Sequence, residues 1–316
     1  MKPFNVFPYG STINFMRLRM VSLIVAGALM FAAIGAIAIN GFNFALDFTG
    51  GIGVELRMAK PVDVDVVRER LSKAGYENAQ VQTLGAGTDL LVRLQQDSAP
   101  SADKAASVGQ QVRDAVATPD NAATLRSSAE ISAQVGKELA LKGIWALVFV
   151  IVGFLIYISF RFQAKFAAAA IITTLHDVIV VLGWFALTGH EFDLTVLAGV
   201  LSVMGYSIND TIVVFDRVRE NFRGMRACAS EVLNASINQT LSRTIITSFV
   251  ALLTVLALYF YGGQSLRGMA ESQLIGILIG TLSSIFVACP LLLWFGVTKQ
   301  DLMPKARDEA ALARRP

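Results

Sequence analysis

Six runs of mostly apolar residues, each long enough to cross a lipid bilayer, constrain this chain more than any other feature. A membrane-spanning helix needs about 20 predominantly apolar residues. The runs cover residues 20–39, 143–160, 166–187, 194–215, 244–261 and 274–297. Only 16% of the 316 residues are charged, against about 25% in a typical soluble domain. The sequence therefore predicts a polytopic α-helical membrane protein with six transmembrane helices.

Composition also excludes several classes of function. The chain has only two cysteines and two histidines, too few for a disulfide framework or a structural metal site. The net charge is +3, and no basic patch is interleaved with aromatic residues, so nucleic acid is not an expected partner. No cofactor, no metal and no enzymatic reaction are predicted.

The positions of Lys and Arg predict the orientation of the spans. Four basic clusters precede the first run, follow the second, follow the fourth and follow the sixth. With six spans, all four lie on one side, which is the cytoplasmic side by the positive-inside rule. Residues 1–19 and 298–316 are then cytoplasmic, the latter as a tail expected to be disordered, and 216–243 form a cytoplasmic loop that includes the start of the fifth span.

The first run admits a second interpretation. Residues 36–38 read Ala-Ile-Ala, which fits a signal-peptide cleavage site. The apolar region of a signal peptide, however, extends over about 7–15 residues, and this run is longer. An uncleaved membrane anchor is therefore the preferred interpretation.

Residues 40–142 are soluble-like and are expected on the periplasmic side, because long loops cross the membrane regardless of charge. The pattern predicts a strand at 51–58, a helix at 62–76, a hairpin at 79–95 with a Gly-Ala-Gly turn, a helix at 101–117 capped by Ser101, and a strand at 122–135. The order β-α-β-β-α-β is typical of ferredoxin-like folds. With no His or Cys, this domain is predicted to bind or gate.

Asp210 is the strongest candidate for function. It lies within the fourth run, about 10 Å of helix from Arg217, too deep for an interfacial residue. A carboxylate there costs roughly 2.5–3.5 kcal/mol on insertion scales. Tyr206, four residues earlier, shares its helical face. Intramembrane ionisable residues generally mark ion pathways, although a neutral Asp held by hydrogen bonds for helix packing is the alternative.

Arg243 begins the fifth run and is the expected partner of Asp210. The fourth and fifth runs are consecutive and antiparallel, and both residues lie toward their cytoplasmic ends. The alternative is an interfacial Arg whose long side chain extends to the headgroups.

His176 and Asp177 form a second polar insertion, within the third run. A proton relay and a structural hydrogen-bonded pair between helices both remain open for them. Small and weakly polar residues of the last two runs are expected to serve close helix packing: Ser242, Thr244, Thr247, Ser248, Gly276, Gly280, Ser283 and Ser284.

Four stretches of the chain resemble the SecD/SecF proteins, the membrane subunits of bacterial protein export within the resistance-nodulation-division superfamily. FALDFTGG (44–51) resembles the family's Asp-Phe-x-Gly-Gly signature, carried here by Asp47, Phe48, Gly50 and Gly51. GYSINDTIVVFDRVREN (205–221) and QTLSRTIITS (239–248) resemble the fourth and fifth spans of SecF members, and LHDVIVVLG (175–183) fits the third. We also expect the two glycines to form a chain-reversal joint, because Gly tolerates positive φ.

The resemblance implies a subunit in the bacterial inner membrane that acts with SecD beside the SecYEG channel, with YajC as a further candidate partner. It implies that protons drive the export of unfolded secretory polypeptides. It also implies functional roles for Asp210 and Arg243, with a complementary carboxylate on SecD. Two other functions remain alternatives: a half-size proton-coupled efflux transporter, and an intramembrane aspartyl protease that uses Asp177 and Asp210.

Overall fold

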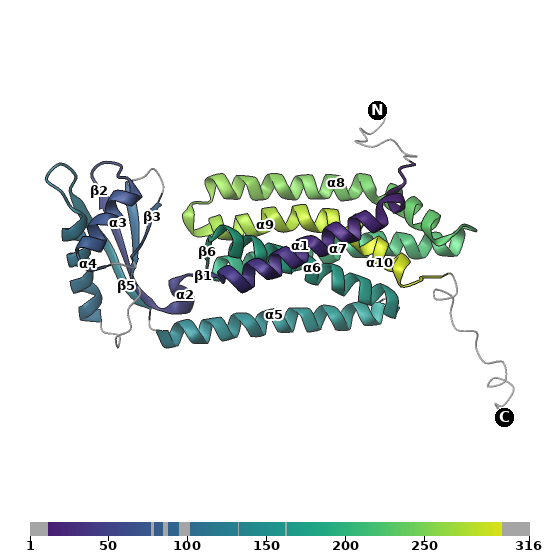
Figure 1. The fold of residues 1–316 in the computed structure, drawn as a ribbon, viewed down its shortest axis with the longest axis horizontal. Coiled ribbons are helices and arrows are strands. Elements are labelled where there is room, and N and C mark those ends of the chain that lie inside the picture. Colours follow the sequence, from purple (N-terminus) through teal and green to yellow (C-terminus); the bar gives the residue numbers. More distant parts are fainter. Residues whose placement is uncertain are drawn as a thin grey trace, which may run out of the picture.

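The computed structural model describes residues 12–76, 79–84, 88–94, 102–131, 133–161 and 163–298. A bundle of long helices carries a small α/β domain at one end (Figure 1). The predicted Gly-Ala-Gly turn, the Ser101 cap and the tail after Thr298 lie outside the described residues.

Six apolar helical segments in the described part of the chain are long enough to cross a membrane, which confirms the predicted polytopic architecture. The helices are α1 (Arg19–Asn40), α5 (Ala133–Arg161), α6 (Ala164–Thr188), α7 (Leu194–Gly224), α8 (Ala229–Tyr261) and α9 (Gln264–Ser283). A one-turn π-helix, η2 (Ser284–Ala288), joins α9 to α10 (Cys289–Trp294), and a 3₁₀ turn, η1 (Phe15–Leu18), precedes α1.

Several helices extend well beyond their apolar runs. After Phe215, α7 continues to Gly224, and α8 starts at Ala229 after the N-cap Cys228. Polar contacts stabilise these extensions: Arg217 pairs with Glu220 at 2.9 Å, and the Asn221 amide donates to the Ser236 hydroxyl at 2.8 Å. Hydropathy marks only the apolar part of a helix, so it underestimates helix length here.

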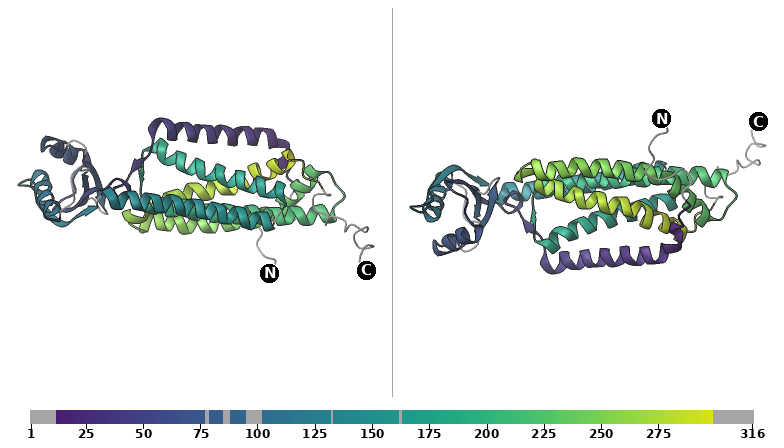
Figure 2. Two further views of the ribbon diagram at one scale, coloured as in Figure 1. Left: turned by 90° about the horizontal axis from the view of Figure 1, so that it is seen from below. Right: turned by 90° about the horizontal axis from the view of Figure 1, so that it is seen from above.

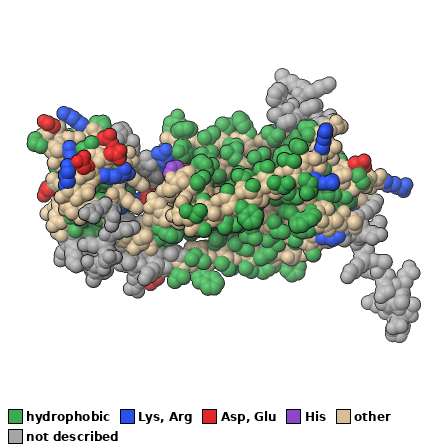
Figure 3. Space-filling view, viewed as in Figure 1, with side chains coloured by type: hydrophobic (Ala, Val, Ile, Leu, Met, Phe, Trp, Pro, Cys, Tyr) green, Lys and Arg blue, Asp and Glu red, His purple; other side chains and the backbone are tan. Residues whose placement is uncertain are grey.

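The bundle has a buried centre and an exposed periphery. About half or more of the apolar segment is buried in α6, α7 and the last helix, but only 11–17% in α1, α5 and α8. In Figure 2, α1 lies along one side of the bundle. Figure 3 shows hydrophobic side chains covering the bundle, whereas charged side chains gather on the α/β domain and at the opposite end. This distribution suits a membrane around the bundle.

The α/β domain has the predicted ferredoxin-like order. Its elements are β2 (Gly51–Met58), α3 (Val64–Lys73), β3 (Gln80–Leu84), β4 (Asp89–Leu94), α4 (Ala102–Val116) and β5 (Ala123–Ile131). All strand pairs are antiparallel, in the spatial order β3-β4-β2-β5. The buried strand positions Ile52, Val54 and Val92 pack against Val67 and Leu71 of α3 and residues of α4. The core is therefore formed within the domain.

Because none of the described residues of this core comes from the bundle, the domain should fold alone. Residues 44–138, produced as a soluble fragment, are expected to give a mixed α/β circular dichroism spectrum and a cooperative thermal transition. Val54→Ala is expected to lower the melting temperature, because it leaves a cavity at a fully buried position. A fragment that aggregates or gives a random-coil spectrum would contradict the prediction.

Candidate functional site

Asp210 lies at the interface of α7 and α8 and is only 6% exposed. The Thr244 hydroxyl of α8 donates a hydrogen bond to its Oδ1 at 2.8 Å. Its Oδ2 has no hydrogen-bond partner among the described residues. One oxygen of this buried carboxylate is therefore held in place, while the other is enclosed within the bundle and is the oxygen left to take up a proton.

Arg243 does not contact Asp210, so the predicted ion pair is not formed in this structure: no salt bridge within 4.0 Å joins them in the described part of the chain. Arg243 and Thr244 are adjacent on α8 and so point about 100° apart around its axis. Thr244 faces α7, and Arg243 is exposed on the outer surface of α8.

Tyr206 shares a helical face with Asp210 but bonds elsewhere. Its hydroxyl donates to Ser248 Oγ at 2.7 Å, and Ser248 Oγ is 2.7 Å from Thr281 Oγ1 on α9. These three side chains connect α7, α8 and α9, one turn from Asp210. Tyr206 therefore supports the helix arrangement around the carboxylate without touching it.

Asp177 is fully buried and joins three helices. His176 Nδ1 lies 2.9 Å from its Oδ1, and its Oδ2 accepts hydrogen bonds from Ser207 Oγ of α7 at 2.6 Å and Ser283 Oγ of α9 at 2.7 Å. Close packing of α9 on α7 accompanies this contact, since a Cβ on Gly280 would lie 3.3 Å from Ser207 Cβ. Both oxygens of Asp177 are thus occupied, unlike those of Asp210.

His176 lies beneath α1, and its Nε2 has no hydrogen-bond partner among the described residues. Two grooves, of about 730 and 270 Å³, flank α1, and His176 and Ala26 line both of them. The unpaired nitrogen is therefore a buried polar atom on a side chain that lines both grooves.

Sequence reasoning assigned Thr244, Ser248 and Ser283 to packing alone, whereas the structure gives each a hydroxyl hydrogen bond to a candidate site residue. Their spacing carries no signal for this role, because it depends on which face of α8 and α9 meets α7. The π-turn η2 follows Ser283 directly. Such turns often occur at functional sites, and it too was missed.

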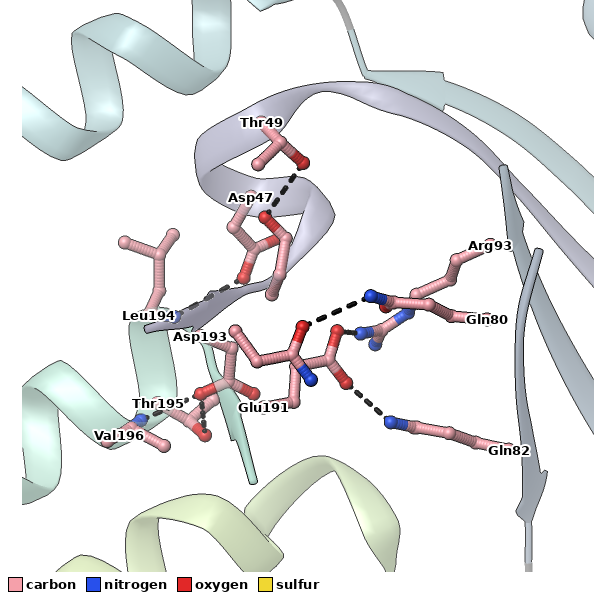
Figure 4. Close-up of polar contacts among 12 residues, drawn as sticks. Asp47, Thr49, Gln80, Gln82, Arg93, Glu191, Asp193, Leu194, Thr195 and Val196 are labelled. Atoms are coloured by element: carbon pink, nitrogen blue, oxygen red, sulfur yellow. Dashed lines mark hydrogen bonds and ion pairs between the residues drawn. The ribbon is translucent and has the colours of Figure 1, made fainter. Parts of the chain in front are cut away.

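The glycine motif forms the joint between bundle and domain. Gly50 and Gly51 both have positive φ, 72° and 138°, in agreement with the predicted chain reversal. The short helix α2 (Leu46–Thr49) precedes them, and β2 follows. Asp47 Oδ2 accepts a hydrogen bond of 3.4 Å from the Leu194 amide, at the first turn of α7 (Figure 4). Phe48 packs against Phe192, with ring centroids 6.0 Å apart.

Gly51→Val is expected to disturb this joint, because a β-branched residue does not adopt a φ of 138° without strain. Membrane insertion should remain normal, and the export activity that the family resemblance implies should fall. Gly27→Val is the matched control, since Gly27 has open space around it and no positive φ. Complementation of an export-defective strain measures the effect, and normal export by the Gly51→Val variant would argue against a mechanical joint.

Part of α7 faces outward at the depth of Asp210. Ala198, Ser202, Gly205 and Asn209 are exposed at spacings of three and four residues, so they share one face. A Cβ on Gly205 would meet no atom within 4 Å. This face, which we call the α7 open face, is suited to close approach by another helix, since small residues favour such packing in membranes.

Comparison with known proteins agrees with this architecture. The sequence matches the family model described as "Protein export membrane protein SecD/SecF, C-terminal" over residues 111–298, and the "SecD/SecF GG Motif" over residues 35–62. It is 45% identical to Protein translocase subunit SecF of Pseudomonas aeruginosa over 94% of this chain and 96% of that protein.

Two solved structures of SecDF are similar to this chain. SecDF from Thermus thermophilus, described as a translocon-associated membrane protein, is 34% identical with a TM-score of 0.81. SecDF in a super-membrane-facing form is 33% identical with a TM-score of 0.63. In both cases the match covers 92% of this chain but only 40% of the longer one. By its motifs, fold and relatives, the chain belongs to the SecD/SecF family of protein-export membrane proteins.

Proposed function

We propose that this chain is the SecF-type subunit of a protein translocase and that it works as one half of a complex with a SecD-type partner. The observation that carries the proposal is the match to fused SecDF chains, of which this chain corresponds to 40%. Membrane transporters of this kind are often built from two related halves that meet near their ion-binding residues. We propose that a SecD-type partner supplies the second half.

The α7 open face is the proposed contact with SecD. It places Asn209 on the outside of the helix that carries Asp210, and Arg243 of the neighbouring helix α8 is exposed as well. An exposed Arg in the membrane is costly unless it is paired or reaches the interface. A carboxylate supplied by SecD would give Arg243 a partner, as the family resemblance implies.

Asp210 is the proposed proton-binding group. Thr244 holds one of its oxygens, and the other has no partner among the described residues. When ionised, it is stabilised by the positive charge of Arg243, and protonation removes that attraction. A proton that moves down about 100 mV releases roughly 2.3 kcal/mol, which is enough to change the population of two helix arrangements.

The pair His176 and Asp177 is the second candidate for proton transfer. Its oxygens already accept hydrogen bonds from two other helices, which favours a structural role. The unpaired Nε2 of His176 is the observation that keeps a relay open.

The remaining assignments follow from the proposed role. The chain is placed in the bacterial inner membrane with both termini cytoplasmic and the α/β domain in the periplasm. Its proposed partners are SecD, the SecYEG channel and YajC, and its proposed cargo is an unfolded secretory polypeptide. Export then uses the proton-motive force.

The two alternative functions have less support. A self-contained efflux transporter of this kind would need a second set of spans beyond the six found in the described residues. An aspartyl protease would need two carboxylates that share a water, yet Asp177 and Asp210 bond to different helices and to no common residue in the described part of the chain.

Purification from native membranes without a cross-linker tests the proposal. A SecD-type protein is expected to co-purify in a fixed ratio. Gly205→Leu on the α7 open face should reduce the amount of that protein that co-purifies. Gly153→Leu, on α5 with open space around it, is the matched control. Purification as a homo-oligomer would favour the efflux alternative, and equal loss with both variants would contradict the proposed contact face.

A further inference from the structure

The α/β domain meets the bundle through one face of its sheet. Gln80 and Gln82 of β3 and Arg93 of β4 point toward the membrane end (Figure 4). Gln80 and Arg93 are direct cross-strand neighbours. The alternating residues Val81 and Val92 point the other way, into the domain core. Period-two alternation thus divides these strands into a core face and a docking face.

An ion pair between Arg93 and Glu191 is the central contact of this docking face. The two side chains are only 19% and 13% exposed. Gln82 Nε2 donates a hydrogen bond to the other carboxylate oxygen, Glu191 Oε2, at 2.6 Å. Burial lowers the pKa of Arg93, and the nearby carboxylates Asp47 and Asp193 oppose that effect. Arg93 is thus one cation among three acidic groups.

A second link lies beside the first. Gln80 Nε2 donates to Asn43 Oδ1 at 3.1 Å. Asn43 belongs to β1 (Asn43–Phe44), which pairs in parallel with β6 (Glu191–Phe192), so that Asn43 lies opposite Glu191. The two-stranded sheet and the domain are therefore bound to each other through neighbouring residues.

Glu191 lies three residues before the first residue of α7. Asp193 caps that helix by accepting a hydrogen bond of 2.7 Å from the Val196 amide, and Asp47 accepts from the Leu194 amide. Phe192 packs at 5.1 Å from Phe42 and 6.0 Å from Phe185, between ring centroids. The residue that holds the domain is thus fixed to the first turn of α7.

The helix that begins at this junction also carries Asp210. It runs without a break from Leu194 to Gly224, and Asp210 lies about 24 Å along its axis from Leu194. A continuous helix moves as a rigid element. A shift of α7 near Asp210 therefore also shifts Glu191, and with it whatever Glu191 holds.

The two solved SecDF structures fit this chain to different extents. Coverage is 92% in both and sequence identity is nearly equal, but the TM-scores are 0.81 and 0.63. The matched elements are therefore not arranged identically in the two structures.

We propose that the Arg93–Glu191 pair, supported by Gln82, is the contact through which movement of α7 is passed to the α/β domain. This inference rests on the proposed function, in which Asp210 binds the proton. It adds the contact through which that proton would act on the α/β domain. Arg93 and Glu191 are positioning residues: they touch neither the proton nor the cargo. Two sites are physically coupled when both of them bias the position of one structural element. Here the two sites are Asp210 and the Arg93–Glu191 pair, and the element is α7.

Hydrogen–deuterium exchange on the full chain purified with its native partner tests the contact. In Arg93→Met and in Glu191→Gln, amides of 43–48 and 189–196 are expected to exchange roughly tenfold faster, because a hydrogen bond to a charged group is lost. Amides of β2 should not change, which shows that the domain remains folded. The double variant should exceed the stronger single variant only slightly.

Arg57→Met is the matched control. Arg57 also pairs with a carboxylate on the same sheet, Asp89 at 3.7 Å, but its side chain is 54% exposed. Exposed pairs contribute little, so this variant should leave exchange at the junction unchanged. Equal acceleration by Arg57→Met would overturn the proposal, as would normal exchange in Arg93→Met.

Coupling is tested by adding Asp210→Asn. In the otherwise unchanged chain, Asp210→Asn is expected to change exchange in β3 and β4 severalfold, and in the Arg93→Met background this change should disappear. No change in the first case, or an equal change in both, would overturn the proposal. Because exchange is measured without export, a failure of proton-driven export in the unchanged protein would instead contradict the proposed function.

Discussion

The Asp210→Asn variant is expected to lose the response of export to the proton gradient while it still assembles with its partner. Asn keeps the size of the side chain, and its Oδ1 can still accept the hydrogen bond from Thr244. It cannot gain or lose a proton, so the site is fixed in the neutral state. Assembly should survive, because the substitution removes a costly buried charge rather than adding one.

Export into inverted membrane vesicles, with and without a proton gradient, measures this effect. The gradient should raise the export rate of the unchanged protein severalfold. The export rate of the Asp210→Asn variant should be the same with and without the gradient. Asp216→Asn is the matched control on the same helix, because Asp216 lies beyond the apolar run that ends at Phe215 and is 44% exposed. A full response by Asp210→Asn would mean that the residue serves only helix packing.

Arg243→Met should also lose the response of export to the proton gradient, but for a different reason. Without the opposite charge nearby, Asp210 should remain protonated throughout the cycle. The double variant should then be no worse than Asp210→Asn alone, which is the non-additivity expected of two residues in one step. Additive losses would show that Arg243 acts independently, for example by binding its own group on the partner.

Hydropathy and the spacing of apolar residues along the chain predicted most of this fold, because both depend directly on whether a residue faces water, lipid or the protein core. The apolar runs specified six membrane helices, since only helices and closed barrels satisfy the backbone in lipid and runs of about 20 apolar residues match the length of a spanning helix. The alternation of 51–58 and the helical face of Val67 and Leu71 specified the ferredoxin-like domain. Helix ends were underestimated where polar residues continue a helix beyond the membrane, as in α7 after Phe215.

The candidate site was predicted only in part, because the sequence identifies costly residues but not their partners. Asp210, His176 and Asp177 stood out as polar groups in apolar runs. Which hydroxyl meets which carboxylate depends on the rotation of each helix, and a rotation of one residue separates Thr244 from Arg243 by about 100°. The contact between Arg93 and Glu191 joins residues far apart in the sequence, and no local pattern indicates it.

The role of Asp177 can be decided by comparing two substitutions. Asp177→Ala is expected to lower the stability of the bundle by about 1–3 kcal/mol, because the hydroxyls of Ser207 and Ser283 lose their acceptor inside the membrane domain. Asp177→Asn should change stability little, since the amide oxygen can still accept a hydrogen bond and the hydroxyls can rotate. If the residue is structural, Asp177→Asn should also keep the response of export to the gradient.

The chain supplies its own reporter for this measurement. Cys289 is buried, and Cys228 is exposed, so in a Cys228→Ser background a thiol reagent labels Cys289 only as the bundle opens on heating. The labelling midpoint should fall for Asp177→Ala and stay near the original value for Asp177→Asn. Ser283→Ala, which removes only one of the hydroxyls, should lie between them. A stable Asp177→Asn variant that no longer responds to the gradient would instead assign His176 and Asp177 to the proton path, with the unpaired Nε2 of His176 as the point of entry.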